Sequence, residues 1–416
     1  MDRMIEKYTY YTFLAILTTA AMFFAPIEVQ AQKKQIAQAK EKIKAKKDVA
    51  QAENSMRVLL ADSAYATNEK VWLTMIAAEN TIYDMGNENL YLKQQIDTTA
   101  WLQATMRLFQ DMERFDSIDA LPDKKGRVQP KHREKHTERL NTIRPNLYFG
   151  GTYFLAKGNY SESLRFYNKY IDCDTIAMLR KYKYSEKDSI MIQAAYWAMY
   201  AATKCGEYKK ALTYREMAER DSTHLNFILQ YISECYSQMK DTENYVNTLR
   251  EGFTRYPSFP FFYPRLIEYY QNCNMNDSAM AVTDKALKTD STNINFMLTK
   301  STLLLNRGDY AESLYYCYNI LQKDSTVADT YYNIGLIYFN QAIEIDKVRQ
   351  TSAAKKRQME NLYRQSLPYL EKYRAMAPEK KQRWMSPLYT IYLNLNMGKE
   401  FDEIDKLINE YRRNNK

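Results

Sequence analysis

The feature that most constrains this chain is a set of small and turn-forming residues that recur every 34 positions. The three registers are Gly206, Lys240, Asn274 and Gly308; Ala211, Tyr245, Ala279 and Ser313; and Ala218, Gly252, Ala286 and Ile320. A period of this length is typical of a helix–turn–helix unit, which buries its apolar face by stacking on copies of itself. The sequence therefore predicts an all-α chain built as a solenoid.

The composition agrees with long stacked helices. The 416 residues include only 10 Gly and 10 Pro but 37 Tyr. A low content of both helix-breaking residues argues against an all-β or a disordered chain. Tyrosine has a large apolar ring with a polar tip, which suits the half-buried faces between helices. We therefore interpret the tyrosines as packing residues first.

The cysteines do not suggest a disulfide framework. Cys173, Cys205, Cys235, Cys273 and Cys317 are odd in number and show no C-x-x-C spacing. Four of them fall inside the expected repeat helices, where a free cysteine is a small apolar filler. Neither a disulfide scaffold nor a zinc site is expected.

The N-terminal sequence predicts export. An apolar stretch at residues 8–25 is followed by Val29-Gln30-Ala31 and then by a polar run, which is the pattern of a signal peptide cleaved after Ala31. An uncleaved membrane anchor is the alternative, because 18 residues are just enough to span a bilayer. No cysteine precedes Cys173, so a lipid anchor on an N-terminal cysteine is excluded. We expect a periplasmic or envelope-associated protein that is not a lipoprotein.

Much of the positive charge is local. The net charge is +9, and residues 33–47 hold seven lysines against one glutamate. Such a run fits a solvated helix face, and it also fits contact with an acidic membrane surface or a nucleic acid. Export would separate the protein from nucleic acid, so we expect no nucleic-acid partner.

The region before the clear repeats is also expected to be helical. Residues 32–60 predict one helix with a broad charged face, and apolar spacing predicts further helices over 68–85 and 89–115. Residues 116–131 carry Pro, Gly and charge, which indicates a loop. We expect residues 32–143 to form an N-terminal helical region in which degenerate repeats are plausible.

From about residue 144 the repeats become explicit. The same turn pattern occurs at residues 157–160, 205–208 and 307–310, each time with a central glycine and a small residue five positions later. Tyr331, Ile334, Gly335 and Tyr338 follow a second part of the pattern. These residues resemble the tetratricopeptide-repeat family. The resemblance implies a right-handed α-solenoid over residues 144–378, followed by a helical cap at 379–416. It implies little about function.

Two insertions break the period. One adds 14 residues near 175–188, and the other adds 19 residues around 342–365. The second has no Pro or Gly and many helix-forming residues, so we expect both helices of one repeat to extend as a basic hairpin. Such an insertion can lie on the binding face or be a passive extension.

No catalytic motif is present. The sequence has no glycine-rich phosphate loop, no H-E-x-x-H and no G-x-S-x-G motif. His132 and His136 have the spacing of two metal ligands on one helix face, but Lys131, Arg133 and Lys135 would repel a cation. We expect no enzyme activity, no cofactor and no metal.

The resemblance also implies a binding surface, because certain first-helix positions of that family face the concave side. Carried onto this sequence, the candidate partner-binding residues are Tyr196, Tyr200, Gln238, Glu268, Asn272, Asn306, Tyr332 and Asn340. Four of them form a series of side-chain amides with the 34-residue spacing. An amide can donate to and accept from an extended peptide backbone. The residues with which some family members clamp a peptide carboxylate are absent.

These observations favour a non-catalytic scaffold of the bacterial cell envelope that binds a protein or peptide through the concave groove. Two alternatives remain open at this stage. A tyrosine-rich groove could bind glycans or cell wall, and residues 32–143 could hold the site of an envelope enzyme subunit. The sequence gives neither the partner nor the oligomeric state.

Overall fold

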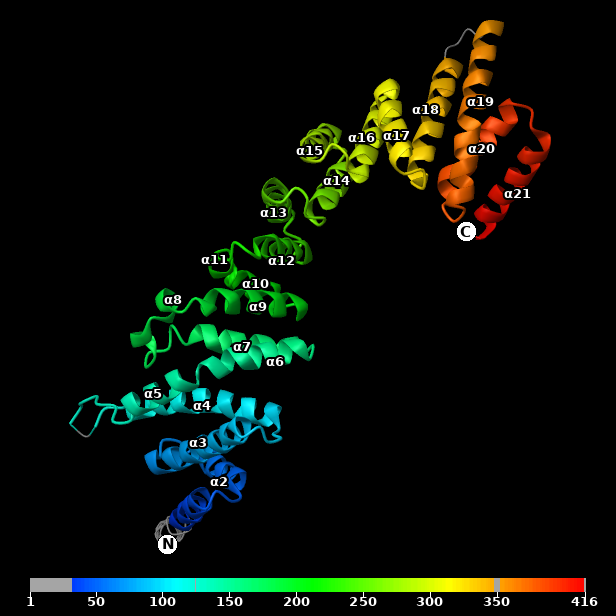
Figure 1. The fold of residues 1–416 in the computed structure, drawn as a ribbon. Coiled ribbons are helices and arrows are strands. Elements are labelled where there is room, and N and C mark those ends of the chain that lie inside the picture. Colours follow the sequence, from blue (N-terminus) through cyan, green and yellow to red (C-terminus); the bar gives the residue numbers. More distant parts are fainter. Residues whose placement is uncertain (1–31, 124, 348–351, 415–416) are drawn as a thin grey trace, which may run out of the picture. The chain divides into compact units, whose positions relative to one another are not determined.

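The computed structural model describes residues 32–123, 125–347 and 352–414, and the regular elements within these ranges are all helices (Figure 1). The chain divides into two compact units, Met1–Lys240 and Asp241–Lys416. In each unit, a helix packs mainly against the helices that come just before and after it in the sequence. The first helices of neighbouring pairs also touch, as α9 (Ile190–Lys204) and α12 (Leu225–Gln238) do.

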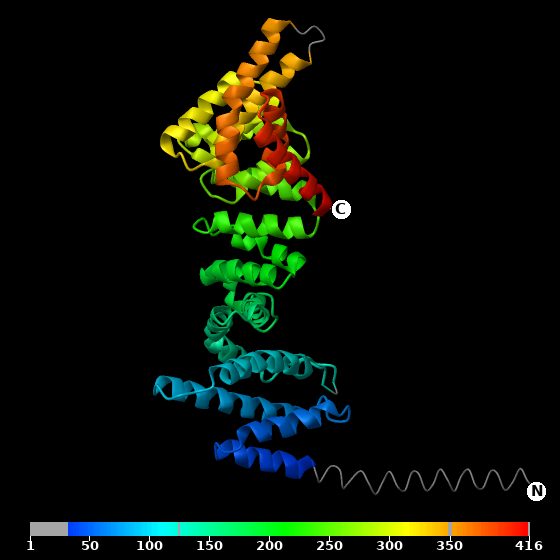
Figure 2. The ribbon, with the colours of Figure 1, turned by 90° about the vertical axis from the view of Figure 1, so that its right-hand side faces the viewer.

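The first unit begins with an unlabelled helix at residues 32–44. It continues with α2 (Val49–Ala61), α3 (Glu69–Tyr91), α4 (Thr98–Asp119), α5 (Arg133–Ile143), α6 (Pro145–Ala156), α7 (Tyr160–Asp172), η1 (Arg180–Tyr182), α8 (Tyr184–Lys187), α9, α10 (Tyr208–Thr213), α11 (Arg215–Ala218) and α12. Figure 2 shows these helices as successive layers.

The second unit contains the more regular pairs. Its helices are α13 (Thr242–Arg255), α14 (Phe262–Asn272), α15 (Asn276–Thr289), α16 (Ile294–Arg307), α17 (Tyr310–Lys323), α18 (Ala328–Asp346), α19 (Ala353–Met376), α20 (Lys381–Asn394) and α21 (Gly398–Asn414). The expected all-α repeat solenoid is confirmed.

The first 34-residue register is a register of turns. Gly206 and Gly308 have φ values of 76° and 91°, and Lys240 and Asn274 have values of 59° and 54°. A positive φ lets the chain reverse direction after the first helix of each pair, and glycine reaches it without steric cost. Lys240 and Asn274, which depart from the glycine of the pattern, therefore hold the same backbone conformation as the glycines.

A second recurring contact joins the two helices of a pair. The Ser163 hydroxyl donates to the Gly151 carbonyl at 2.9 Å, and the Ser313 hydroxyl donates to the Ser301 carbonyl at 2.8 Å. All three serines of this kind, the third being Ser366, are fully buried. A larger side chain here would hold the helices apart, which explains the small residues Ala211, Ala279 and Ser313 of the second register. The half-buried Tyr245 is the exception in this register.

Residues 32–60 do not form the single helix that the sequence predicts. The chain turns at Lys46 and Asp48, whose φ values are 51° and 52°, and the Lys47 amide donates to the Lys42 carbonyl at 3.1 Å. Two short helices at 32–44 and 49–61 result. The reversal lets the apolar residues of both segments, such as Ile36 and Val49, become buried. Good helix formers continue through this turn, so the sequence pattern alone did not predict the reversal, which tertiary packing decides.

The predicted break between residues 85 and 89 is also wrong. Asn68 caps α3 as its side chain accepts from two backbone amides, but the helix then runs through Gly86 to Tyr91. A Cβ at Gly86 would lie 2.4 Å from Trp101, so this glycine serves close packing and not a turn. The turn comes later, at Lys93, with φ of 55°.

The two insertions adopt different structures. Residues 175–188 fold back onto the buried Arg144, whose guanidinium binds Asp188 at 2.6 Å and lies 3.7 Å from the ring centres of Tyr170 and Tyr184. The second insertion lengthens α18 to 19 residues and α19 to 24, as predicted for a hairpin (Figure 2). The connection at 348–351 lies outside the described residues.

The cysteines are free, as expected, but their positions require one correction. Cys173, Cys235 and Cys317 are buried, whereas Cys205 and Cys273 are exposed. The two exposed cysteines are the C-cap residues of α9 and α14, so they do not act as apolar fillers.

The predicted signal peptide lies outside the described residues. Within the described part of the chain, no helix combines the length and the apolar character needed to cross a bilayer.

Candidate functional site

Three predicted amides occupy equivalent places in the second unit. Asn272 is the last residue of α14, Asn306 lies near the end of α16, and Asn340 lies in α18. Asn272 and Asn306 are exposed and Asn340 is half-buried. None of the three side chains has a hydrogen bond to another described residue, so their donors and acceptors are available for a ligand. Gln238 is exposed at the end of α12 in the first unit.

The other two predicted residues of the second unit differ in accessibility. Glu268 is exposed on α14. Tyr332 is half-buried, and the Arg383 guanidinium lies 4.0 Å from its ring centre. Its ring centre also lies 4.9 Å from that of Tyr373. Tyr332 therefore packs between α18, α19 and α20, whereas Glu268 can meet a partner directly.

Tyr196 and Tyr200 belong to an aromatic cluster of the first unit. Tyr196 is only 6% exposed and stacks on His224 at 4.9 Å. Tyr200 is half-buried and lies 5.3 Å from Tyr231 and 6.0 Å from Trp197. Burial raises the pKa of Tyr196 and of Tyr200, so both phenols are neutral at ordinary pH. Tyr196 forms the buried part of this cluster, and Tyr200, Trp197 and Tyr231 form the accessible part.

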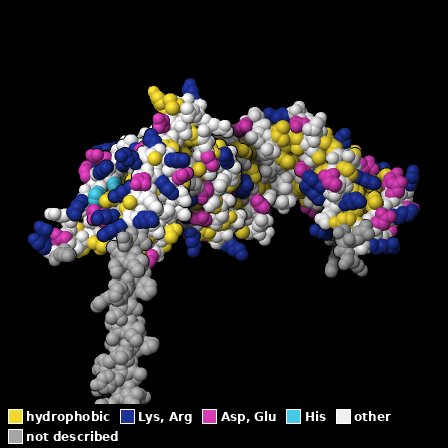
Figure 3. Space-filling model, turned by 90° about the horizontal axis from the view of Figure 1, so that it is seen from below, with side chains coloured by type: hydrophobic (Ala, Val, Ile, Leu, Met, Phe, Trp, Pro, Cys, Tyr) yellow, Lys and Arg dark blue, Asp and Glu magenta, His cyan; other side chains and the backbone are white. Residues whose placement is uncertain are grey.

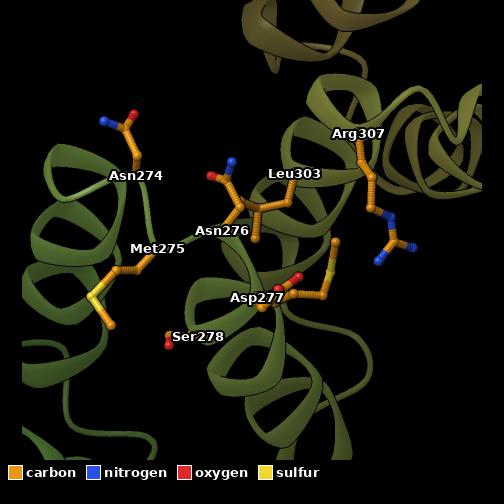
Figure 4. Close-up of a pocket in the computed structure, with 8 residues that line it drawn as sticks. Asn274, Met275, Asn276, Asp277, Ser278, Leu303 and Arg307 are labelled. Atoms are coloured by element: carbon orange, nitrogen blue, oxygen red, sulfur yellow. The ribbon is translucent and has the colours of Figure 1, made fainter.

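A pocket at the edge of the second unit lay outside the sequence-based prediction. It measures about 510 Å³ and lies between the turn at Asn274 and the end of α16. In Figure 4 the side chains of Asn274 and Arg307 lie on opposite sides of the pocket, with Asn276 and Asp277 between them. The carboxylate of Asp277, the guanidinium of Arg307 and the side-chain amides of Asn274 and Asn276 line the pocket. It therefore suits a polar or zwitterionic ligand group better than an apolar one.

A second pocket continues along the same edge. It measures about 490 Å³ and is lined by residues 307–312 and Gln341. Arg307 lines both pockets and pairs with Asp309. The sequence signal for this edge was the 34-residue turn register itself, which we interpreted only as a structural feature. The pockets and the amides Asn272 and Asn306 both lie near the turn end of the helix pairs.

The N-terminal region contains a buried cluster of charged groups. One guanidinium nitrogen of Arg57 lies 3.0 Å from Glu53, 2.6 Å from Glu79 and 2.8 Å from Asp111. Arg107 also binds Glu53 at 2.9 Å. Glu79 is fully buried, and its burial, followed by its contact with Asp111, raises its pKa to about 10.

This cluster bears on the enzyme hypothesis for residues 32–143. A buried polar cluster is a feature that such a site would need, and α2, α3 and α4 provide one. However, the carboxyl groups of Glu53, Glu79 and Asp111 all contact Arg57, which joins the three helices without a substrate. The second oxygen of Glu79 is buried and has no hydrogen-bond partner among the described residues.

The two histidines with metal-ligand spacing contact aromatic and acidic neighbours. His132 and His136 have ring centres 6.0 Å apart, and each lies within 5.7 Å of Phe115. His132 lies 3.2 Å from a Glu69 oxygen. Burial, and then the neighbouring His132, lowers the pKa of His136 to about 4. Within the described residues, no group of three or more His, Cys, Asp and Glu side chains could hold a metal ion.

Charged side chains of both signs cover the visible surface. On the face that Figure 3 shows, Lys and Arg lie among Asp and Glu, and apolar side chains reach the surface between them. This mixture differs from the uniform positive field that a nucleic-acid backbone attracts.

Comparison with known proteins identifies similar structures but no sequence relative. No protein-family model matches the chain, and no curated protein matches it. The C-terminal part of a TPR repeat-containing protein from Cytophaga hutchinsonii has 12% identity and a TM-score of 0.42, with 62% of this chain and 93% of that chain covered. A tetratricopeptide repeat protein from Parabacteroides merdae has 16% identity and a TM-score of 0.34, covering 61% and 98%.

A third similar structure is the TPR domain of P58(IPK), with 12% identity, a TM-score of 0.28 and coverage of 88% of this chain and 98% of that chain. All three likenesses are too distant to transfer a function. The fold itself rests on the left-handed turns, the serine–carbonyl contacts and the helix pairs described above. It is an all-α array of stacked helix–turn–helix repeats.

Proposed function

We propose that this chain is a non-catalytic scaffold of the bacterial cell envelope, which binds a protein or peptide partner along the first-helix faces of its repeats. The observation that carries the proposal is the repeated amide of the second unit. Asn272, Asn306 and Asn340 recur on successive first helices, and their side chains have no partner among the described residues. An extended peptide offers backbone donors and acceptors at regular spacing, which such a row can satisfy.

The pockets at the turn edge support the same function. Pockets of about 510 Å³ and 490 Å³ adjoin one another through Arg307. Each is large enough for one polar side chain of a bound peptide. Amides that hold the backbone and pockets that accept side chains are the two parts of peptide recognition.

The basic hairpin is the second contact surface in this proposal. Lys356 and Arg357 are exposed near the start of α19, and they would attract an acidic partner. The base of the hairpin has another role, since Ala342, Met359 and Tyr363 are buried in the core of α18–α21. A test of the hairpin should therefore change Lys356 and Arg357 to glutamine and not delete residues 342–365.

The proposed location rests on the N-terminal sequence alone. We infer that the chain is exported and cleaved after Ala31, which would leave Gln32 as the first residue. N-terminal sequencing of the protein recovered from an envelope fraction tests this. A chain that starts at Met1 in the membrane fraction would favour the anchor instead, and recovery in the cytoplasm would reject both.

The experiment that tests the scaffold is site-specific photocrosslinking in the cell. A photoreactive residue replaces Asn306 on a first helix, and a matched one replaces Lys288, which is exposed on the second helix α15. We expect a discrete adduct from position 306 that disappears when Asn272 and Asn340 are changed to alanine. Equal adducts from both positions, or none from position 306, would reject the groove.

A second candidate function is favoured by the aromatic cluster of the first unit. Tyr200, Trp197 and Tyr231 are half-buried, so parts of three adjacent rings reach solvent. Aromatic faces of this kind can stack on sugar rings, which would make the chain a glycan- or cell-wall-binding protein. Titration with soluble peptidoglycan fragments, followed by tryptophan fluorescence, separates the two functions. A saturable change that Tyr200→Ala abolishes would support the glycan, and no change would remove it.

A further inference from the structure

A small hollow in the first unit has the chemistry of an anionic amphiphile site. It measures about 250 Å³ and lies between the helix of residues 32–44 and α3. Three lysines, Lys40, Lys44 and Lys70, line it from both helices. No aspartate or glutamate is among its lining residues, so the three ammonium groups create an uncompensated positive potential there.

The lysines converge because of helical spacing. Lys40 and Lys44 are four residues apart, so they lie on one face of their helix. Lys70 begins the corresponding face of α3. Within the described part of the chain, none of these three side chains has an ion pair or hydrogen bond. Nearby lysines behave differently, since Lys42 binds Gln51 at 2.6 Å and Lys46 pairs with Glu88.

The floor of the hollow is mostly apolar, and the hydroxyl of Thr74, which also lines it, donates to the Lys70 carbonyl at 2.7 Å. Ile43 comes from the first helix, and Leu73 and Ala77 come from α3. Ile43 and Leu73 are half-buried and Ala77 is exposed, so apolar surface is open to a ligand between the lysines. A free inorganic anion would gain nothing from this floor, whereas a ligand with an anionic head and an apolar neighbour would use both parts.

We propose that this hollow binds the head group of an anionic phospholipid, so that the N-terminal end of the chain lies on a membrane surface. The phosphate would meet Lys40, Lys44 and Lys70, and the start of the acyl chains would cover Ile43 and Leu73. A volume of about 250 Å³ accommodates a head group and not a whole lipid. Clusters of basic residues next to an apolar segment are a recognised form of attraction to anionic lipid.

Sequence position favours a membrane over an acidic protein as the occupant. The seven-lysine run at 33–47 begins eight residues after the apolar stretch at 8–25, so it would lie beside the bilayer during export, before the proposed cleavage after Ala31. The lipid site requires only described helices of the first unit. Its test is therefore independent of the proposed peptide groove in the second unit.

The test uses the chain from Gln32 onward, which contains every described residue. Its binding is measured by flotation with vesicles of phosphatidylglycerol and phosphatidylcholine in equal parts, against vesicles of pure phosphatidylcholine. The site variant is Lys40→Gln/Lys44→Gln/Lys70→Gln. The control removes the same charge from exposed lysines outside the hollow, as Lys33→Gln/Lys34→Gln/Lys47→Gln. Thermal melting by circular dichroism checks that both variants fold.

We expect the wild-type chain to float only with the anionic vesicles. The site variant should bind them about 100-fold more weakly, and the control less than about tenfold. Equal losses in the two variants would show unspecific attraction to charge and would overturn the site. Failure of the wild-type chain to bind anionic vesicles would overturn it as well.

Two further measurements separate the lipid from other anions. Leu73→Gln keeps all three lysines but makes the floor polar, and we expect it to weaken vesicle binding about tenfold. Calorimetric titration with inorganic phosphate should give no saturable binding in the millimolar range. Tight phosphate binding together with an unaffected Leu73→Gln variant would identify a plain anion site and overturn the lipid proposal. An acidic protein bound at these lysines in preference to vesicles would also overturn it.

Discussion

The first unit buries charges between its helices, whereas the second buries mainly hydroxyl groups. Glu79, Asp111 and Arg144 are each at most 7% exposed in the first unit. In the second unit the corresponding buried groups are mostly serines and threonines, together with the amide of Asn333 and one buried lysine, Lys300. Both units therefore join their helices through buried polar groups. These are mainly charged groups in the first unit and mainly hydroxyl groups in the second.

The difference follows from the regularity of the repeats. In the second unit the same hydroxyl–carbonyl contact joins the helices of two pairs, through Ser313 and Ser366. The first unit has helices from 4 to 23 residues long, and there we find this contact only at Ser163 among the described residues. There, ion pairs such as Arg57–Asp111 and Arg144–Asp188 join segments far apart in sequence. We infer that buried charge selects the helix pairing where repetition does not.

The largest expected effect is the loss of the Arg57 network. Arg57→Ala leaves Glu53, Glu79 and Asp111 without their shared cation, and we expect the free energy of unfolding to fall by about 3 kcal/mol. Urea denaturation measures it, and hydrogen exchange should locate the loss in α2–α4. Lys46→Ala is the control, because the Lys46–Glu88 pair is exposed and should contribute less than about 1 kcal/mol. Similar losses in both variants would contradict the comparison.

The next effect is a pH dependence confined to the first unit. Glu79 has a folded pKa of about 10 against 4.5 in the unfolded chain, so the folded state holds a proton that the unfolded state releases between these values. Its contribution to stability is therefore complete below pH 4.5 and is lost as the pH rises toward 10. We expect Glu79→Gln, which stays neutral, to flatten the fall in the urea midpoint between neutral and alkaline pH. An unchanged slope would mean that Glu79 is ionised in the folded protein.

A smaller effect should be equal in the two units. Ser163→Ala and Ser313→Ala each remove the hydroxyl that donates to a carbonyl of the first helix, and we expect each to cost about 1 kcal/mol. Thermal unfolding of both variants measures it. The variant Ser291→Ala, at an exposed serine, serves as the control. A cost in only one of the two units would show that the shared contact is not energetically equivalent.

The smallest effect concerns the turns. Lys93 in the first unit and Asn274 in the second have φ values of 55° and 54°. Glycine relieves the steric cost of this conformation but loses more chain entropy on folding. We therefore expect Lys93→Gly to raise the free energy of unfolding by about 0.5 kcal/mol. Asn274→Gly should gain less, since asparagine tolerates this region better. Gly308→Ala is the reverse test and should lose about 1 kcal/mol. Destabilisation by Lys93→Gly would contradict the assigned turn.

The sequence predicted the regular repeats better than the N-terminal helices. The 34-residue register located the turns inside four successive helix pairs, from Gly206 to Gly308, because each repeat has the same local backbone requirement. The same reasoning failed at residues 32–60 and at the end of α3. In both places good helix formers continue through a turn or past an expected break, and burial decided where the chain reverses.

For the candidate site, too, the sequence predicted some features and missed others. Register alone placed Asn272, Asn306 and Asn340 at equivalent positions, and in the structure Asn272 and Asn306 are exposed. Register could not reveal that Tyr196 is buried against His224 or that Arg307 lines two pockets. These facts depend on neighbours that come from other helices.

The sequence by itself determined the all-α repeat architecture, the turn positions of the regular repeats and the lengthened hairpin of α18 and α19. These features arise from local backbone preferences and from a period written in the residues. Only the tertiary structure decided which charges are buried together, which aromatic rings remain accessible and where Lys40, Lys44 and Lys70 meet. Each of these depends on helices that pack side by side, so the groups involved have no common pattern along the chain.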